Sequence, residues 1–407
     1  MIIKKIVINK EIILSINNER EIELILKYIK QFNNINHFIN DIKQIKNEII
    51  NLKEENKILK NEIKKLKKYH ENNNNLKNIK LLYNISNDSY VNSTLDNSFV
   101  VFKSINYILY LIYSNKNKSI ICYDLNEKRK IKELKHYHNE YISNFRHYLD
   151  EVNKRDLIMS ISGEDNNIKI WNINNWECIL NLTNINKQGV LYSSCFLNQN
   201  NNIYIITSNF YIKGKSESIK IFDFNGQQIK EIKDSNEPTF LIDTYYDNIS
   251  SKYYIITGNF NYSKSYDYEK NNIYHKYIDN DNDNDKRYII LSIIIKNNNG
   301  IIKLIESSTD GILRIFNFHS GLLLNKLKIT NNKLYGICLL NDNYLFVGCE
   351  DKTIKIVEIQ NELIVKSLIG HNNQVITIKK IIHPKYGECL ISQNWLQSEI
   401  KLWVNEI

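Results

Sequence analysis

Four side chains in the second quarter of the chain are of the types that nucleophilic catalysis uses. His138, Ser160 or Ser162, and Asp165 could serve as base, nucleophile and orienting acid, the set that performs acyl transfer in serine hydrolases. Trp171 follows six residues after Asp165. No glycine-rich phosphate loop, nucleophile elbow or kinase signature accompanies them in the sequence. The set can equally be a buried polar network, so its meaning depends on the elements that position it.

A second group of polar residues has the alternation that begins a calcium loop. Its carboxylates occupy every other position: Asp279, Asp281, Asp283 and Asp285. The sixth position is Asn284, where the loop needs glycine, and the twelfth is Ile290, where it needs glutamate. We therefore expect a solvated, low-complexity insert without calcium. The histidines at 136, 138 and 147 lack partners at zinc spacing, so we expect no metal site and no cofactor.

The elements around these residues repeat along the chain. Seven strand-like runs end on an aromatic or bulky apolar residue, 41 to 51 positions apart by subtraction: Tyr123, Trp171, Phe222, Tyr266, Phe316, Val357 and Trp403. A period in the forties with strand alternation inside each unit is typical of a propeller whose units are four-stranded blades. The sequence predicts an all-β, seven-bladed β-propeller.

The repeat resembles the WD-repeat family. Gly370-His371 stands 32 residues before Trp403, and His138 stands 33 before Trp171, by subtraction. The family's turn aspartate appears six positions before the closing residue at Asp165, Asp310 and Asp351. Other residues take that slot in the remaining units: Asn117, Ser216, Phe260 and Gln397.

The resemblance implies structural roles for the polar set. It assigns His138, Ser160 or Ser162, Asp165 and Trp171 to a buried hydrogen-bonded network that fixes blade geometry, and His371 with Trp403 to the same positions of the last blade. An enzyme is therefore not expected. The last unit ends soon after Trp403 and has only three strands, so we expect residues 78–85 to supply its fourth strand and the propeller to span 76–407.

Residues 35–70 follow a heptad repeat. Its seam positions are Ile42, Ile45, Ile49, Leu52, Asn56, Leu59, Ile63 and Leu66. Isoleucine at a, leucine at most d positions and one a-site asparagine favour a two-stranded coiled coil. Acidic g residues and lysines at e would attract across a parallel pair, which predicts a parallel homodimer. The alternative is a single helix packed on the propeller. We assign 19–70 to the coiled coil and 71–75 to a linker, and leave 1–18 unassigned.

The charge distribution and the cysteines limit which cellular compartments and which classes of partner are expected. Residues 1–75 hold 15 Lys/Arg and 10 Asp/Glu, so +5 of the net +9 lies there and +4 on the remaining chain. A near-neutral propeller makes nucleic acid an unlikely partner, although Lys64, Lys65, Lys67 and Lys68 form a basic cluster. No apolar run is long enough to span a bilayer, and no signal peptide is evident. The six cysteines form no Cys-x-x-Cys pair, and we expect them to be buried, reduced thiols, which favours a cytoplasmic, or else a nuclear, protein.

These features predict a non-enzymatic scaffold that binds protein partners through the propeller rim and is dimerised by its coiled coil. The resemblance places partner contacts in the turns that lead into each first strand and the turns before each third strand. The matching positions are Tyr141, Glu164, Thr309, Glu350, Gln374, Trp395 and Leu396. The alternative is a nucleic-acid or chromatin-associated regulator that uses the basic end of the helix.

Overall fold

The structure is a computed structural model. It describes residues 4–8, 12–16, 23, 24, 27, 78–90, 97–183, 185, 191–208, 218–233, 238–279, 288–298, 300–396 and 398–405. The chain divides into two compact units, Met1–Asn74 and Asn75–Ile407. In the first unit, β1 (Lys4–Ile8) pairs antiparallel with β2 (Ile12–Ile16), so the unassigned N-terminal segment contains a hairpin.

The coiled-coil prediction falls almost entirely outside the described residues. Within 19–70 only Glu23, Leu24 and Lys27 are described, and their backbone is helical. The heptad positions from 35 onward, and with them the seam and the homodimer, stay predictions.

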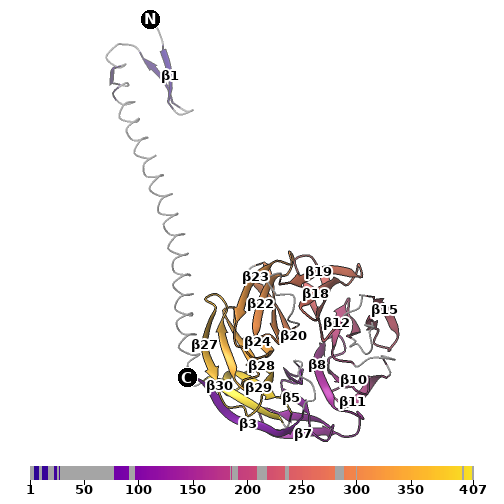
Figure 1. Cartoon of the computed structure of the whole chain (residues 1–407). Helices are drawn as coiled ribbons and strands as arrows, with labels where there is room; N and C mark the ends of the chain where they lie inside the picture. The colour runs from indigo at the N-terminus through magenta and orange to yellow at the C-terminus, as the bar shows by residue number, and fades with distance from the viewer. Residues whose placement is uncertain are drawn as a thin grey trace. The chain divides into compact units, whose positions relative to one another are not determined.

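The second unit consists of seven four-stranded antiparallel sheets (Figure 1). Blade 1 contains β4 (Phe99–Lys103), β5 (Leu109–Ser114), β6 (Ile120–Asp124) and β7 (Arg129–Leu134). Blade 2 contains β8 (Ile142–Asp150), β9 (Arg155–Ser162), β10 (Asn167–Asn172) and β11 (Glu177–Leu182). Blade 3 contains β12 (Ser194–Gln199), β13 (Asn202–Thr207), β14 (Ile219–Phe222) and β15 (Gln228–Ile232). Blade 4 contains β16 (Leu241–Asp247), β17 (Lys252–Gly258), β18 (Tyr262–Asp267) and β19 (Asn272–Ile278).

The remaining three blades complete the ring. Blade 5 contains β20 (Ile290–Asn298), β21 (Ile301–Ser308), β22 (Ile312–Asn317) and β23 (Leu323–Lys328). Blade 6 contains β24 (Leu334–Leu339), β25 (Tyr344–Cys349), β26 (Ile354–Glu358) and β27 (Leu363–Leu368). Blade 7 contains β28 (Val375–His383), β29 (Gly387–Asn394), β30 (Ser398–Asn405) and β3 (Ile79–Ser89). The first strand of every blade contacts the first strands of both neighbouring blades, so these strands surround a central channel.

Blade 7 joins the two ends of the propeller. Its outer strand β3 pairs antiparallel with β30, from Ile79 opposite Asn405 to Ser89 opposite Ser398. The predicted ring closure by residues 78–85 is confirmed, and the strand continues to Ser89. The pairing covers the edge of β30, which would otherwise expose unpaired backbone groups.

The repeated closing residue has a common structural position. In blades 1 to 6 the pairing of the third strand with the fourth shifts register immediately before it, for example between Ile170 and Trp171 in blade 2. Such a bulge increases the local twist and lets a large side chain turn into the sheet packing. Trp171 and Trp403 are accordingly 1% and 2% exposed.

The hydrophobic core lies within and between the blades. One cluster joins Phe99 and Leu125 of blade 1 to Ile391 and Leu402 of blade 7, so it holds the closure together. Four of the six cysteines are buried as free thiols, Cys338 is half-buried, and Cys178 is exposed. The prediction of buried thiols is therefore wrong for Cys178.

Candidate functional site

The predicted polar set of blade 2 meets in one network. His138 Nε2 lies 2.8 Å from Ser160 Oγ, and Trp171 Nε1 donates to the same oxygen at 2.9 Å. His138 Nδ1 lies 3.4 Å from Asp165 Oδ2. Ser160, and not Ser162, is therefore the serine that His138 and Trp171 share.

The burial of Ser160 argues against a nucleophile. Its side chain is fully buried and its oxygen is occupied by both the imidazole and the indole. Burial opposes ionisation of Asp165, but interactions with His138, Ser162 and the Asn139 backbone outweigh it and hold the carboxyl pKa below its ordinary value. The arrangement satisfies the buried Ser160 hydroxyl and the Trp171 indole N–H, and it ties the blade's entry loop to its second and third strands.

The turn aspartates share a local task. Asp165, Asp310 and Asp351 each accept a hydrogen bond from the backbone N–H two residues later, at 3.1, 3.2 and 3.1 Å. This is the aspartate turn that replaces a backbone hydrogen bond in tight connections. The residues therefore shape the turns between second and third strands.

Blade 7 repeats the network without the acid. His371 Nε2 lies 2.7 Å from Ser392 Oγ, which also accepts from Trp403 Nε1 at 2.7 Å. Burial, helped by the charge of Lys401, lowers the pKa of His371 to about 3, so its imidazole is neutral at physiological pH. Gln397, at the aspartate position, lies outside the described residues.

Blade 5 replaces the network with charges. Cross-strand pairing puts Ser160 opposite Lys169 in blade 2 but Glu306 opposite Arg314 in blade 5. The buried Arg314 guanidinium donates to Asp310 Oδ2 at 2.6 Å and to Asp279 Oδ2 at 2.9 Å.

Asp279 thereby corrects the sequence prediction of a solvated insert. It is 4% exposed, and Lys326 also contacts its Oδ2 at 2.6 Å. Two cations stabilise this carboxylate in its buried position. Asp281, Asp283 and Asp285 lie outside the described residues.

An aromatic cluster lies at the same end of the ring as these turns. We call it the mouth cluster, and its members are Tyr192, Phe240, Phe260, Ile289, Leu291, Tyr335, Ile376 and Trp395. Blades 3 to 7 each contribute through a segment entering the first strand or through the turn before the third strand. Phe240 packs edge-on against Phe260 with ring centroids 4.9 Å apart, and Tyr192 lies 6.0 Å from Phe240. Tyr192, Phe260, Ile289 and Trp395 remain partly accessible.

Three predicted partner-binding residues are attached to the mouth cluster. Thr309 Oγ1 accepts from the Ile289 N–H at 2.9 Å. The Tyr335 hydroxyl donates to Gln374 Oε1, and the Trp395 backbone N–H donates to the Gln374 backbone carbonyl at 2.9 Å. The structure thus gathers Thr309, Gln374 and Trp395 around one surface.

The other predicted partner-binding residues have separate surroundings. Tyr141 stacks on Tyr90 with centroids 4.3 Å apart. Glu350 pairs with Lys333 at 3.4 Å. Glu164 is exposed beside Asp165, and the half-buried Leu396 has a left-handed backbone with φ of 52°.

Sequence reasoning missed the aromatic members Tyr192, Phe240 and Tyr335. Each lies just before a first strand or at its second position, where the family motif has no fixed residue. The available signal was the recurrence of an aromatic residue at blade entry. Burial raises the pKa of both Tyr192 and Tyr335, so their hydroxyls stay protonated donors.

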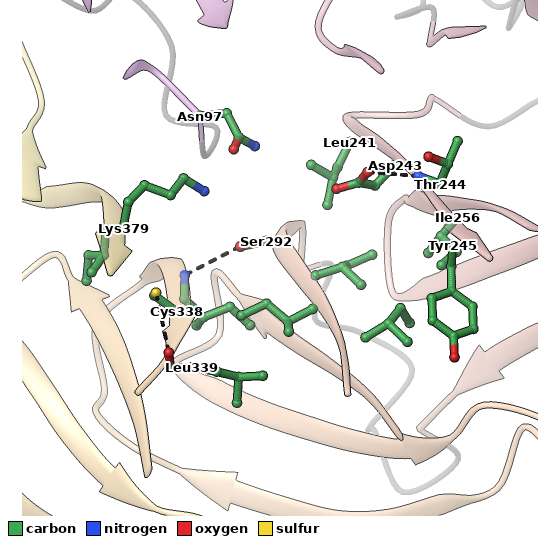
Figure 2. Close-up of a pocket in the computed structure, with 15 residues that line it drawn as sticks. Asn97, Leu241, Asp243, Thr244, Tyr245, Ile256, Ser292, Cys338, Leu339 and Lys379 are labelled. Carbon is green, nitrogen blue, oxygen red and sulfur yellow. Dashed lines mark hydrogen bonds between the residues drawn. The ribbon is translucent and has the colours of Figure 1, made fainter. Parts of the chain in front are cut away.

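The central channel contains a cavity of about 350 Å³ between the first strands of blades 4 to 7 (Figure 2). Aliphatic residues of these strands line it, and the polar side chains of Asn97, Asp243, Ser292 and Lys379 lie around it. Ser292 Oγ accepts from the Ile337 N–H at 3.4 Å, which joins blades 5 and 6.

The described part of the chain meets the requirements of neither a metal site nor a membrane-spanning helix. There, no group of three or more histidine, cysteine, aspartate or glutamate side chains is placed to hold a metal ion. None of its helices has the length and apolar character needed to cross a membrane.

Comparison with known proteins gives a limited similarity. No protein-family model matches the chain. The U3 small nucleolar RNA-associated protein 21 homolog of Schizosaccharomyces pombe (strain 972 / ATCC 24843) is 31% identical over 86 residues. The match covers 21% of this chain and 9% of that protein. The matched part therefore spans under a tenth of the relative's length.

Proposed function

We propose that the protein is a non-enzymatic scaffold of the WD-repeat type that docks protein partners on the mouth cluster. The observation that carries the proposal is the gathering of apolar side chains from five blades at one end of the channel, with the aromatic rings of Tyr192, Phe260 and Trp395 partly accessible. Aromatic side chains fixed in position are favoured anchors of protein interfaces because they bury large areas at little cost in side-chain entropy.

The surroundings of the mouth cluster support docking over catalysis. The histidine, serine and aspartate that could act in acyl transfer are used within a buried network. The cluster itself offers apolar rings bordered by the hydrogen-bonding groups of Thr309 and Gln374. A surface with apolar anchors and a polar border is the usual composition of a protein interface.

Quantitative affinity capture with the full chain tests the proposal. We expect the wild type to capture a set of partners that both Phe260→Ala and Tyr192→Ala fail to capture. Tyr246→Ala is the matched control, because Tyr246 is an exposed aromatic residue outside the mouth cluster. An unchanged set of partners in both mouth variants, at equal expression and melting temperature, would contradict the proposal.

Dimerisation through residues 35–70 is part of the same proposal. Two propellers held on one parallel zipper would bind a multivalent partner more tightly than a single propeller, because the second contact becomes intramolecular. The isoleucine and leucine seam with its single asparagine supports this assignment.

A second candidate function is association with a ribonucleoprotein. The name of the S. pombe relative, which refers to U3 small nucleolar RNA, favours it, as does the cluster Lys64, Lys65, Lys67 and Lys68. It would place the protein in the nucleus, whereas the scaffold fits cytoplasm or nucleus. RNA binding that weakens steeply with salt and is lost when these four lysines become glutamine would support this function. Partner capture that is insensitive to salt would favour the scaffold.

A further inference from the structure

The face of the propeller opposite the mouth carries a series of lysine–tyrosine contacts. In each antiparallel blade, the turns after the first and third strands lie at the end opposite the remaining turns. At this end, blades 7 and 1 contribute what we call the lysine–tyrosine track: Lys103, Tyr107, Lys128, Tyr83, Lys385 and Tyr386.

The ammonium groups of the track lie over aromatic rings. Lys128 Nζ is 4.6 Å from the Tyr83 ring centroid and 5.8 Å from that of Tyr386. Lys385 Nζ is 5.3 Å from the Tyr386 centroid. On blade 1, Lys103 Nζ is 4.8 Å from the centroid of Tyr107. Each pair meets the distance for a cation–π contact, which positions the lysine without neutralising it.

The two blades hold this part of the track together. His383 of blade 7 lies 3.3 Å, through Nε2, from the carbonyl oxygen of Leu125 in blade 1. Lys128 Nζ also donates to the Tyr386 hydroxyl at 3.4 Å across the same boundary. The lysines therefore extend from a preformed junction and not from separate loops.

Lys128 and Lys385 give the junction two ammonium groups, although the propeller as a whole is nearly neutral. Among the described residues, no carboxylate forms an ion pair with Lys128 or Lys385. Burial lowers the pKa of His383, and the positive charges of Lys128 and Lys385 lower it further. Of the nearby acids, Glu388 pairs with Lys380 at 2.8 Å, and Asp124 accepts turn N–H groups, whereas Glu127 is exposed.

We propose that the lysine–tyrosine track binds single-stranded RNA. Lysine ammoniums attract the phosphate backbone, and aromatic faces stack on bases regardless of their sequence. Tyr107 is 76% exposed, which leaves its ring accessible to a base. Lysines that form no ion pair within the described residues, together with an accessible ring on the same face, match the two chemical features that single strands present.

A single-stranded polymer fits this surface better than one phosphorylated side chain. Specific recognition of a single phosphate favours the planar fork of arginine, which donates two parallel hydrogen bonds. The track instead carries lysines spread over two blades, and lysine acts as a point charge without such geometry. Repeated phosphates along a strand can reach several of these charges at once.

The inference is independent of the proposed docking of proteins at the mouth cluster. The two surfaces lie at opposite ends of the blades, and no residue belongs to both. It also differs from RNA binding by the basic cluster at 64–68, because that cluster lies on the other compact unit.

Fluorescence anisotropy of the full chain with labelled single-stranded oligouridine, at several salt concentrations, tests the track. We expect Lys128→Gln combined with Lys385→Gln to weaken binding and to reduce the log–log salt slope by roughly 1.4, at about 0.7 for each lost phosphate contact. Tyr107→Ala should weaken binding about tenfold by removing a stacking ring. The control is Lys116→Gln combined with Lys352→Gln, which removes two exposed lysines from turns at the opposite end.

Each outcome decides for or against the track. Loss in the track variants with wild-type binding in the control, at matched melting temperatures, supports it. An equal loss of RNA affinity in the track and control variants would mean that only the net charge matters, and it would overturn the proposal. Binding abolished only by glutamine at Lys64, Lys65, Lys67 and Lys68 would assign RNA to the other unit. Stronger binding to double-stranded RNA or to a phosphorylated peptide than to oligouridine would also overturn it.

Discussion

Replacing Glu306 with glutamine should change how the stability of the protein depends on pH. Glu306 is fully buried on β21 and its Oε2 accepts a hydrogen bond from Ser263 of blade 4. Its Oε1 has no hydrogen-bond partner, and the neighbouring Arg314 already pairs with Asp310 and Asp279. An ionised Glu306 would therefore be a buried charge that the Ser263 hydroxyl and the Arg314 charge offset only in part.

The size of the effect follows from the shifted pKa. Burial raises the pKa of Glu306 from 4.5 to about 8. Because the folded pKa exceeds the unfolded one, the folded protein binds an extra proton between these values. The stabilisation is therefore complete below pH 4.5 and is lost as pH rises toward 8. The difference of about 3.5 units, at ~1.4 kcal/mol each, gives a loss of up to ~5 kcal/mol.

Denaturant unfolding of wild type and Glu306→Gln between pH 5 and 9 measures this loss. Glutamine keeps the shape and the acceptor for Ser263 but cannot ionise, so the variant should gain stability over wild type as pH increases. Glu362→Gln, at an exposed turn carboxylate, is the control and should follow the wild-type curve. Parallel curves for wild type and Glu306→Gln would refute the assignment of a protonated, buried Glu306.

Three further changes test the blade network, the ring closure and the zipper. Asp165→Ala should lower the unfolding free energy by about 1–3 kcal/mol, and partner binding should fall only in proportion to the folded fraction. Loss of partner binding at an unchanged melting temperature would show that Asp165 has a functional role. A chain that begins at residue 90 lacks β3 and should aggregate, whereas one beginning at 76 should fold; a soluble fragment from 90 with a cooperative melt would contradict the role of the closure. Changing Glu48, Glu55 and Glu62 to lysine should give monomers, measured by light scattering. A second variant with glutamates at the facing e positions should pair with the first and form heterodimers. A lysine variant that stays dimeric would exclude the parallel zipper.

The sequence alone was sufficient to predict the architecture of the propeller. Strand alternation and the recurrence of a bulky closing residue are local properties, because each blade is a meander of consecutive strands. Trp171 and Phe316 lie in equivalent strands for this reason, with a register shift before each. Even the long-range pairing of β3 with β30 was predictable, since a three-stranded last blade needs an edge partner.

The blade networks were predictable only where the motif is complete. The histidine, serine, aspartate and tryptophan of blade 2 have fixed spacing, so their meeting could be anticipated from the resemblance. Blade 5 lacks that pattern. The pairing of Asp279 with Arg314 joins residues 35 positions apart, and a low-complexity context hid the buried aspartate.

Both proposed binding surfaces depend on the closed ring. The mouth cluster collects side chains from five blades, and the contact of Lys128 with Tyr386 spans 258 positions of the sequence. Local periodicity determines which face of a strand is buried, so the buried face could be predicted from the sequence. Which turns become neighbours at either end of the ring is determined only when seven blades pack around one axis, because that packing brings distant polar and aromatic side chains within contact distance.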